Sequence, residues 1–544
     1  MIRDLRTLAR TRFDVLVIGA GVYGAATAWD AAQRGLSVAL VDRGDIGGGT
    51  SFNSLKTLHG GLRSLQALNL TQMRRFIRER RALARLAPHL VRPLPFVIPT
   101  TRHPKRSRLV MRLALAINDL VSRDRNDDLP DPDLHLPAGR VLSPDEARRL
   151  HPFMPAGEVT GGALWHDYQM VHADRLTFAF AQGAAAAGAV VVNYVAAEGF
   201  VIESGRVTGA RLRDRLAEDA FDVRARVVVN AAGAWAPELG ALLPGGAGAA
   251  PAPRLSRAMN LVVSVPPPPQ ACGGVVDGRF LFLVPWRDVS ILGTSHDAHD
   301  GTADALRVTE EDVEQFLRDG RRAFPGASLD RGSVRLVHRG LLPMIAGQGA
   351  DVRLLRESAV VDHASHGTPG LVSIHGVRYT TARHTASEAT DAVFRVLGSE
   401  RPPTCRTATT PLPGGEMRRV AEVEADAVRH NGSLVPEALI RRLVRAYGTR
   451  YDRVLRLARE APALAEPLAS SVAVTGAEIV YATRHELAVT LGDALIRRTE
   501  AGSAGHPGAE AIRRAAALMA AANAWDDART TREIEAVEAF YRLP

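Results

Sequence analysis

Residues 13–42 read FDVLVIGAGVYGAATAWDAAQRGLSVALVD. The apolar run from Phe13 to Ile18 predicts a buried strand, the small residues from Ala25 to Gln33 predict a helix, and Leu36 to Val41 predicts a second strand. Between the first strand and the helix stands GAGVYG at residues 19–24. This is the G-x-G-x-x-G pattern of a dinucleotide-binding βαβ unit.

Each glycine of this pattern has a physical role. Gly19 permits a tight turn, Gly21 lets the backbone approach a pyrophosphate, and Gly24 lets the helix pack on the strand. The N–H groups at the helix N-terminus bind phosphate, and Asp42 at the end of the second strand would bind a ribose hydroxyl. The stretch therefore predicts a nucleotide site, and the alternative is a glycine-rich turn that binds nothing.

Length and composition limit the class of protein. A chain of 544 residues is too long for one core, so two or three domains are expected. Its hydrophobic content of 46% and charged content of 23% are typical of a soluble globular protein. Two cysteines cannot build a disulfide framework, which fits a reducing cytoplasm. No metal site is expected.

The net charge is +9, and it comes from arginine far more than from lysine. This excess fits an anionic substrate, an anionic membrane surface, or an arginine-rich composition without a specific role. The basic residues are not interleaved with aromatic ones, so nucleic-acid binding is not expected. The N-terminus has no apolar core of a signal peptide, and no stretch of 18 apolar residues predicts a membrane span.

Three loops are expected to contact the cofactor, because each follows a predicted strand or is rich in small residues. The first loop contributes Arg43, Thr50, Ser51, Asn53, Ser54, Lys56, His59, Gly60 and Gly61. The second, after the strand Val227 to Asn230, contributes Ala231, Ala232, Gly233 and Trp235. The third, after the strand Leu371 to Ile374, contributes Gly376, Val377, Arg378, Tyr379 and Thr380.

Two helices are predicted beyond the βαβ unit. Residues 62–87 carry a long helical pattern that ends before Pro88. Residues 105–125 combine a broad apolar face with flanking arginines. This second helix fits either a membrane interface or a core helix with a basic rim.

The motifs taken together resemble the flavin-dependent glycerol-3-phosphate dehydrogenases of bacteria and mitochondria, which have a D-amino-acid-oxidase-like flavoprotein core. The resemblance covers nearly the whole chain. Besides the fingerprint at 19–24, it rests on KTLHGGLR at 56–63, APHL at 87–90, MRLAL at 111–115, NAAGAW at 230–235, VPW at 284–286, GT at 293–294, TPLPGG at 410–415, EIVY at 478–481 and RRT at 497–499.

The resemblance and the strand patterns imply an α/β fold with three domains. A Rossmann-like FAD-binding domain is expected over residues 13–100, 170–240 and 350–400. An inserted antiparallel-sheet substrate domain is expected over 101–169 and 241–349. A C-terminal all-α domain is expected over 405–544.

The resemblance also implies roles for three arginines. Arg63 stands where the family holds the substrate phosphate, and Arg356 aligns with a second phosphate-contacting arginine. A guanidinium forks onto phosphate oxygens, which suits these positions. Arg378 stands where the family has lysine beside the flavin ring, and its charge would stabilise an anionic reduced flavin.

The sequence departs from the family where substrate would bind. Ser64 replaces a tyrosine, Asn260 replaces the family's candidate base, and Leu342 falls near a family arginine. Because asparagine cannot take a proton from an alcohol, we expect the base among His59, His296 and His338. A packed or surface role is the alternative for each histidine, and for His59 that role is to fix the glycine loop over the flavin.

Three hypotheses about function follow. The first is an FAD-dependent dehydrogenase of glycerol 3-phosphate or a related anionic alcohol, passing electrons to quinone or oxygen. The second is an amine or amino-acid oxidase on the same core, and the third is a non-catalytic flavoprotein. We expect a cytoplasmic protein, with contact to the inner face of the cell membrane and a homodimer as further expectations.

Overall fold

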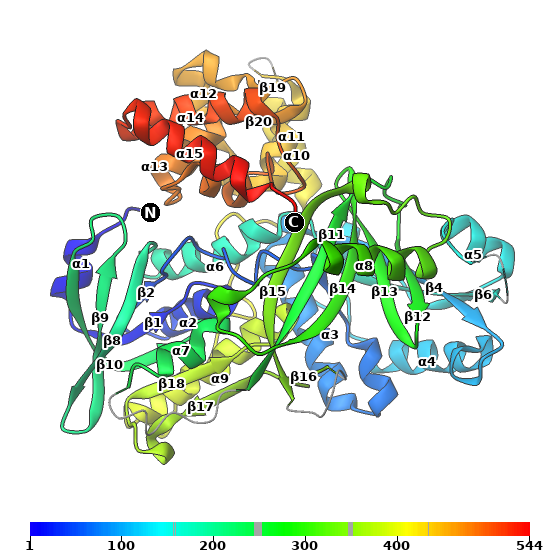
Figure 1. The fold of residues 1–544 in the computed structure, drawn as a ribbon, viewed down its shortest axis with the longest axis horizontal. Helices are drawn as coiled ribbons and strands as arrows, with labels where there is room; N and C mark the ends of the chain where they lie inside the picture. Colours follow the sequence, from blue (N-terminus) through cyan, green and yellow to red (C-terminus); the bar gives the residue numbers. More distant parts are fainter. Residues whose placement is uncertain (156, 158, 244–252, 346–351, 433–434) are drawn as a thin grey trace.

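The computed structural model describes residues 1–155, 157, 159–243, 253–345, 352–432 and 435–544. The chain builds two large sheets that lie side by side, with a helical C-terminal domain above them (Figure 1). No helix in these described ranges is long and apolar enough to cross a membrane.

The first sheet is the predicted nucleotide-binding sheet. In spatial order it consists of β17 (Ala359–Asp362), β18 (Leu371–His375), β10 (Ala220–Asn230), β1 (Phe13–Ile18), β2 (Val38–Val41) and β7 (Val190–Val192), with β8 (Val195–Glu203) and β9 (Arg206–Asp214) extending from β10. The strands from β18 to β7 are parallel. The predicted βαβ unit is confirmed as β1, α2 (Val22–Gln33) and β2.

Small residues let the helices pack closely on this sheet. Helix α2 contacts both α6 (Ala173–Ala186) and α9 (Ala382–Val396). Ten of its residues are buried, and five of them are alanines. The rings of Trp29 and Phe180 fill the space that remains between α2 and α6, with their centroids 5.6 Å apart.

The second sheet is largely antiparallel, as predicted for the substrate domain. Its strands are β16 (Arg353–Leu354), β15 (Val334–Ile345), β11 (Arg254–Val263), β14 (Val289–His299), β13 (Arg279–Trp286), β12 (Ala271–Val276), β4 (Val91–Thr101), β6 (Val159–Met170) and β3 (Thr57–Leu58), and β5 (Arg140–Leu142) pairs with β6. Strands β3 and β4 lie here although the sequence assigns residues 13–100 to the FAD-binding domain. The long pairing of β4 with β6, from Val91 to Thr101, decides this membership.

The predicted helix over residues 62–87 is wrong in its first turns. Residues Leu62–Ala67 form a 3₁₀ segment, Leu68 takes a left-handed conformation with φ of 51°, and α3 spans Leu70–Leu86. The Asn69 side chain caps α3 by accepting a hydrogen bond from the Gln72 N–H at 2.9 Å. The helix therefore begins at this cap, and the segment before it is free to take a loop-like path.

The C-terminal domain contains six α-helices within its described residues. They are α10 (Val420–Asn431), α11 (Glu437–Tyr447), α12 (Tyr451–Glu460), α13 (Gly476–His485), α14 (Ala509–Asn523) and α15 (Asp527–Phe540). The domain is not wholly α, because β19 (Pro467–Ala469) and β20 (Val472–Thr475) form a hairpin. That hairpin packs against α14.

Buried ion pairs join the C-terminal domain to the first sheet. Asp45, in the loop after β2, accepts hydrogen bonds from Arg497 at 2.6 Å and from both terminal nitrogens of Arg498 at 2.6 and 2.9 Å. Nearby, Arg175 of α6 pairs with Glu486 at 2.8 Å. Burial alone would raise the pKa of Asp45, but the two arginines outweigh it and hold that pKa at about 2.

We expect Asp45→Asn to lower the free energy of unfolding by about 3 kcal/mol or more, since it leaves buried arginine charge without its partner. The folded-state pKa lies below the ordinary aspartate pKa of 3.8, so this contribution is complete above that pH and is lost as the pH falls toward 2. Urea denaturation at pH 7 and near pH 3 measures both effects. Asp277→Asn, which breaks an exposed pair with Arg322, is the control and should change little. Equal effects of the two variants would contradict the assignment.

Candidate active site

The glycine pattern brings the turn after β1 against the end of β10. Gly19 has a φ of 102°, and a Cβ there would lie 2.5 Å from the Ala231 carbonyl oxygen. A Cβ on Gly24 would lie 1.8 Å from the Gly19 carbonyl oxygen. Both positions therefore require glycine, and the Gly19–Gly24 turn packs against the second predicted loop at Ala231.

The start of α2 has the groups needed to bind a phosphate. The Ser51 hydroxyl accepts a hydrogen bond from the Val22 N–H at 3.0 Å, which places the predicted loop at this helix end. Among the described residues, no acceptor contacts the N–H groups of Gly21 and Tyr23. Unpaired N–H groups at a helix N-terminus favour an anion.

Asp42 lies beside this helix end and holds the turn. Its two carboxylate oxygens accept hydrogen bonds from the Ala20 N–H at 2.6 Å and the Gly44 N–H at 2.9 Å. Burial raises the pKa of Asp42, although these two bonds oppose the shift. Each oxygen keeps a second lone pair, so the carboxylate retains the capacity to accept from a ribose hydroxyl.

Tyr23 joins the glycine fingerprint to the third predicted loop, a role that sequence reasoning missed. Its hydroxyl donates to the Arg378 carbonyl at 2.7 Å and accepts from the N–H groups of Val377 at 3.0 Å and Arg378 at 2.9 Å. A Cβ on Gly376 would lie 2.2 Å from the Tyr23 ring. The glycine is therefore required for this contact, and the tyrosine sets the position of Arg378.

The second predicted loop forms an exposed rim of the nucleotide site. The Arg43 guanidinium lies 4.4 Å from the centre of the Trp235 ring. Asp304 of the substrate domain accepts hydrogen bonds from both of these side chains, at 3.0 Å in the case of Trp235. Ala232 and Gly233 form the turn that leads to Trp235.

The loop that contains Thr50, Asn53 and Ser54 is attached to the second sheet. The Thr50 hydroxyl bonds to both backbone groups of Leu341, at 3.3 Å and 3.2 Å. Asn53 accepts from the Arg339 N–H at 3.3 Å, and Ser54 accepts from the Lys56 N–H at 3.3 Å. These side chains hold the loop between the two sheets.

Lys56 and His338 lie beneath this loop and not in the site. Both side chains are fully buried, so neither can contact a ligand in this conformation. The Lys56 ammonium lies 3.9 Å from Asp174 and 4.5 Å from the centre of the Phe52 ring, and burial lowers its pKa to about 8. Burial likewise holds the pKa of His338 well below its ordinary value. This packing in the core does not favour their predicted roles in cofactor contact and base catalysis, which stay predictions.

His59 is half exposed and is held by two partners. Its ring nitrogens lie 3.3 Å from an oxygen of Asp167 and 2.9 Å from the Thr57 hydroxyl. The backbone N–H of His59 donates to the Thr380 hydroxyl at 3.1 Å, which brings the first and third loops together. Asp167 on β6 also accepts from the Gly60 N–H at 2.7 Å and pairs with buried Arg80.

Asp167 is the residue on which the His59–Gly61 loop depends, and no sequence motif marked it. Burial tends to raise its pKa, but the hydrogen bond from His59 and the charge of Arg80 leave the pKa below its ordinary value. The carboxylate is therefore charged at neutral pH and orients the His59 ring. Gly61, with a φ of 78°, turns the chain away directly after this contact.

Arg63, Arg378 and His296 influence one another electrostatically. Burial lowers the pKa of Arg378, and the charge of Arg63 lowers it further. Burial also lowers the pKa of His296 to about 4, with added contributions from Arg63 and Arg378. Among the described residues no carboxylate pairs with either arginine, and the buried Nε of Arg378 has no hydrogen-bond partner. The two arginines therefore carry positive charge that no described acid neutralises.

Arg356 belongs to the same region through a short chain of hydrogen bonds. Ser64 donates to the Gln72 side-chain oxygen at 3.0 Å, and the Gln72 amide donates to the Arg356 carbonyl at 2.7 Å. The Arg356 side chain is exposed and has no ion pair among the described residues. Ser64, which replaces the family tyrosine, thus ties the Arg63 segment to the Arg356 segment.

Asn260 and Leu342 have structural places in the second sheet. The Asn260 side chain is buried, accepts from the Thr294 hydroxyl at 2.7 Å and donates to the Asn53 carbonyl at 3.2 Å. Leu342 pairs with Ser256, whose hydroxyl lies 3.3 Å from the His296 ring. Asn260 supports the cofactor loop and cannot act as a base.

Comparison with known proteins agrees with this geometry. The family described as FAD dependent oxidoreductase matches residues 14–383, and the C-terminal domain of alpha-glycerophosphate oxidase matches residues 405–530. The crystal structure of glycerol-3-phosphate dehydrogenase from Bacillus halodurans complexed with FAD superimposes with a TM-score of 0.77 at 26% identity, covering 98% of this chain and 95% of that chain.

Two curated relatives extend over most of the chain. Glycerol-3-phosphate dehydrogenase of Synechocystis sp. is 31% identical over 510 residues, covering 91% of this chain and 90% of the relative. Glycerol-3-phosphate dehydrogenase 2 of Mycobacterium tuberculosis is 32% identical over 537 residues, covering 97% of this chain and 88% of the relative.

The match of residues 14–383 to the FAD dependent oxidoreductase family and the likeness to the FAD-bound structure show that the chain is an FAD-dependent oxidoreductase, and FAD is its cofactor. The chain belongs to the FAD-dependent glycerol-3-phosphate dehydrogenase family. The unpaired N–H groups of Gly21 and Tyr23 fit the pyrophosphate, and the unpartnered Arg378 Nε fits an electron-rich group.

We expect Asp167→Asn to keep the fold of the first sheet but to loosen the His59 loop, because the amide cannot satisfy both His59 and the Arg80 cation. Stability should fall by about 3 kcal/mol, the usual cost of an unpaired buried charge. Urea denaturation measures this change, and hydrogen exchange of the 57–63 segment measures the loosening. Arg140 pairs with Glu146 near the surface of the same sheet, so Glu146→Gln serves as the control. Unchanged exchange in Asp167→Asn would show that the carboxylate does not hold the loop.

Proposed function

We propose that the protein oxidises the secondary alcohol of glycerol 3-phosphate, or of a closely related small anionic alcohol, to a ketone. The observation that carries this proposal is that Arg63 and Arg378 interact electrostatically and have no acidic partner among the described residues. The Gln72 side chain joins the Arg356 backbone to Ser64, directly after Arg63. Three cations left unpaired beside a flavin site favour a substrate that brings its own negative charge. The names of the Synechocystis and Mycobacterium relatives support the same substrate.

Each residue of the cluster has a definite task in this reaction. Arg63 and Arg356 bind the phosphate with forked hydrogen bonds and so fix the carbinol carbon in one position. Bound FAD supplies the hydride acceptor. The charge of Arg378, which lies in the turn that Tyr23 holds, stabilises negative charge that develops in the site.

His59 is the proposed base that takes the hydroxyl proton. It is partly exposed, and Asp167, 3.3 Å from its ring, orients it. His296 is a poorer base, because burial and the neighbouring arginines lower its pKa to about 4. A proton acceptor with so low a pKa provides little driving force at neutral pH.

The arginine cluster also bears on the alternative functions. An amine or amino-acid oxidase must bind an amino group, and a protonated amine would be repelled by Arg63 and Arg378. A non-catalytic flavoprotein would have no need of the unpartnered Arg378 Nε, whose burial without a hydrogen-bond partner costs free energy of folding. The alcohol dehydrogenase is therefore the function that the site supports best.

The test is anaerobic bleaching of the flavin with a panel of glycerol 3-phosphate, other phosphorylated alcohols, hydroxy acids and amines. We expect glycerol 3-phosphate or a close anionic analogue to bleach the flavin. Arg63→Ala should retain FAD but lose at least about 100-fold in reduction rate at low substrate, since it removes charge-assisted contacts to the phosphate. Bleaching by amines alone would support the oxidase instead, and no bleaching by any compound would support the non-catalytic alternative.

In the same assay, His59→Asn and His296→Asn separate the two candidate bases. His59→Asn should slow flavin reduction by about 100-fold or more, the usual contribution of a general base. His296→Asn should have a smaller effect. The reverse order would assign the base to His296 and leave the substrate proposal intact.

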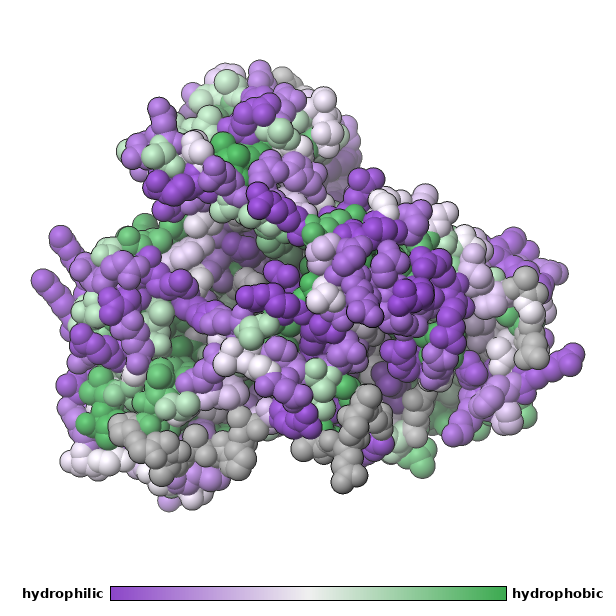
Figure 2. Space-filling model, viewed as in Figure 1, coloured by the Kyte–Doolittle hydropathy of each residue, from purple (hydrophilic) through white to green (hydrophobic). Residues whose placement is uncertain are grey.

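We propose further that helix α4 (Arg108–Val121) rests on an anionic membrane, where a quinone would accept the electrons. Hydrophilic residues cover most of the face seen in Figure 2, yet α4 leaves Leu109, Leu113 and Leu120 exposed at 75%, 61% and 70%. Of its fourteen residues, Leu115 alone is fully buried. Lys105, Arg106, Arg108, Arg112 and Arg123 flank the helix. An exposed apolar face with a basic rim is typical of an interfacial helix.

We expect the double variant Leu113→Gln with Leu120→Gln to bind anionic phospholipid vesicles at least about tenfold more weakly, because each leucine loses the gain of burial in the interface. Its stability should be unchanged, since both side chains are exposed in the protein. Vesicle co-sedimentation measures binding. Leu216→Gln, at an exposed position outside α4, is the control. Equal sedimentation of the two variants would contradict the membrane role, and electron transfer to oxygen would then be favoured.

A further inference from the structure

A basic groove lies between the C-terminal domain and helix α6, away from the flavin site. Its walls are one face of α12, the end of α13 and the last turn of α6, and its volume is about 940 Å³. The basic side chains that line it are Arg450, Arg453, Arg456, Arg484 and His485. We propose that this groove binds a small polyvalent anion of the polyphosphate class, and the proposal does not depend on the proposed function.

The spacing of the arginines gives the groove a row of positive charges. Arg453 and Arg456 lie three residues apart on α12, and Arg450 directly precedes that helix. At 1.5 Å per residue the Cα atoms of Arg453 and Arg456 are about 4.5 Å apart along the helix axis. Arg484 faces them from α13. A row of separate charges suits an anion with several charged groups better than a single monoanion.

These charges are poorly neutralised by acids. Glu460 is the one acidic residue among those that line the groove. Arg450 and Arg456 have acidic neighbours only at 3.8 Å and 3.9 Å, and Arg453 and Arg484 have no ion pair within the described part of the chain. Mutual repulsion is evident, because Arg453 contributes to lowering the pKa of Arg450. Unbalanced positive charge in a concave surface concentrates anions.

The surroundings favour a phosphate anion over a nucleic acid or a membrane. The one aromatic side chain that lines the groove apart from histidine is Tyr481, and its ring is already packed against Tyr447 and His485. No free aromatic surface therefore remains to stack a nucleobase. Helix α4, the proposed membrane contact, lies at the opposite end of the molecule (Figure 1). Guanidinium groups match phosphate oxygens by forked hydrogen bonds.

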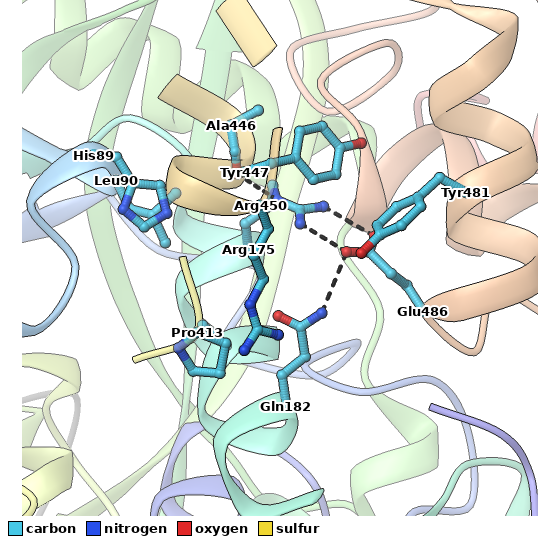
Figure 3. Close-up of a pocket in the computed structure, with 11 residues that line it drawn as sticks. His89, Leu90, Arg175, Gln182, Pro413, Ala446, Tyr447, Arg450, Tyr481 and Glu486 are labelled. Carbon is cyan, nitrogen blue, oxygen red and sulfur yellow. Dashed lines mark hydrogen bonds and ion pairs between the residues drawn. The ribbon is translucent and has the colours of Figure 1, made fainter. Parts of the chain in front are cut away.

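The groove adjoins the ion pairs that attach the C-terminal domain. Figure 3 shows that Arg450, Gln182 and Tyr481, which line the groove, also surround the Arg175–Glu486 pair. Arg175 donates to the Arg498 carbonyl at 2.7 Å, and Arg498 binds Asp45 in the loop after β2. An anion in the groove would therefore stabilise the junction between the C-terminal domain and the cofactor domain.

The test is isothermal titration calorimetry of the FAD-loaded full-length protein with inorganic tripolyphosphate, pyrophosphate and phosphate at physiological ionic strength. We expect one saturable site per chain, with affinity that increases from phosphate to tripolyphosphate. Arg453→Gln with Arg484→Gln should weaken tripolyphosphate binding at least about tenfold, because each arginine loses a charge-assisted contact. Because a bound anion would stabilise the junction between the C-terminal domain and the cofactor domain, tripolyphosphate should raise the melting temperature of the parent but not of this variant.

Two control proteins make the result decisive. Arg513→Gln with Arg532→Gln removes two exposed arginines of α14 and α15 outside the groove and should leave the affinity unchanged. Arg63→Gln should also leave it unchanged, because Arg63 lies in the flavin site. Loss of binding in Arg63→Gln would place the anion in that site and overturn the proposal. Equal affinities in the two double variants, equal affinities for the three anions, or no saturable binding would overturn it as well.

Discussion

The contact between the Gly19–Gly24 turn and the end of β10 is the constraint on which the rest of the structure depends. A Cβ on Gly24 would lie 1.8 Å from the Gly19 carbonyl oxygen, and one on Gly19 would lie 2.5 Å from the Ala231 carbonyl oxygen. Because no methyl group fits, α2 starts directly at the edge of the sheet with its unpaired N–H groups facing the cofactor region. From this helix the Tyr23 hydroxyl holds the turn that carries Arg378.

The proposed base and its carboxylate partner come from the boundary between the two sheets. Asp167 belongs to β6 of the second sheet, yet it orients His59 and binds the Gly60 N–H in a loop that leaves the nucleotide-binding unit. Thr50 and Asn53 make the reverse connection, since they bond to β15. These contacts hold the loop at both of its ends. The buried Lys56 ammonium supports it from beneath by donating to the Phe52 carbonyl. This arrangement gives a rigid support to a segment with many glycines.

Sequence reasoning succeeded where the chemistry is local. The βαβ unit, its glycines and the strands that lead into the Ala231 and Gly376 turns could be predicted, because strand and helix periodicity act over a few residues. The apolar pattern continues from residue 62, so the sequence predicted a helix that starts too early. The Asn69 side chain caps the helix and sets its start at Leu70. The sequence also did not reveal that Lys56 and His338 are buried under Phe52 and Trp286.

The sequence by itself determined a nucleotide-binding βαβ unit, a flavoprotein class and a set of arginines suited to an anionic substrate. Those features depend on residues that are close together in the chain, or on motifs of fixed spacing. Only the tertiary structure decided that Asp167 contacts His59, that Arg63 acts on Arg378 electrostatically, and that burial lowers the pKa of His296. The reason is physical: burial and charge pairing are set by segments more than 100 residues apart, such as His59 and Asp167, and no local pattern records them.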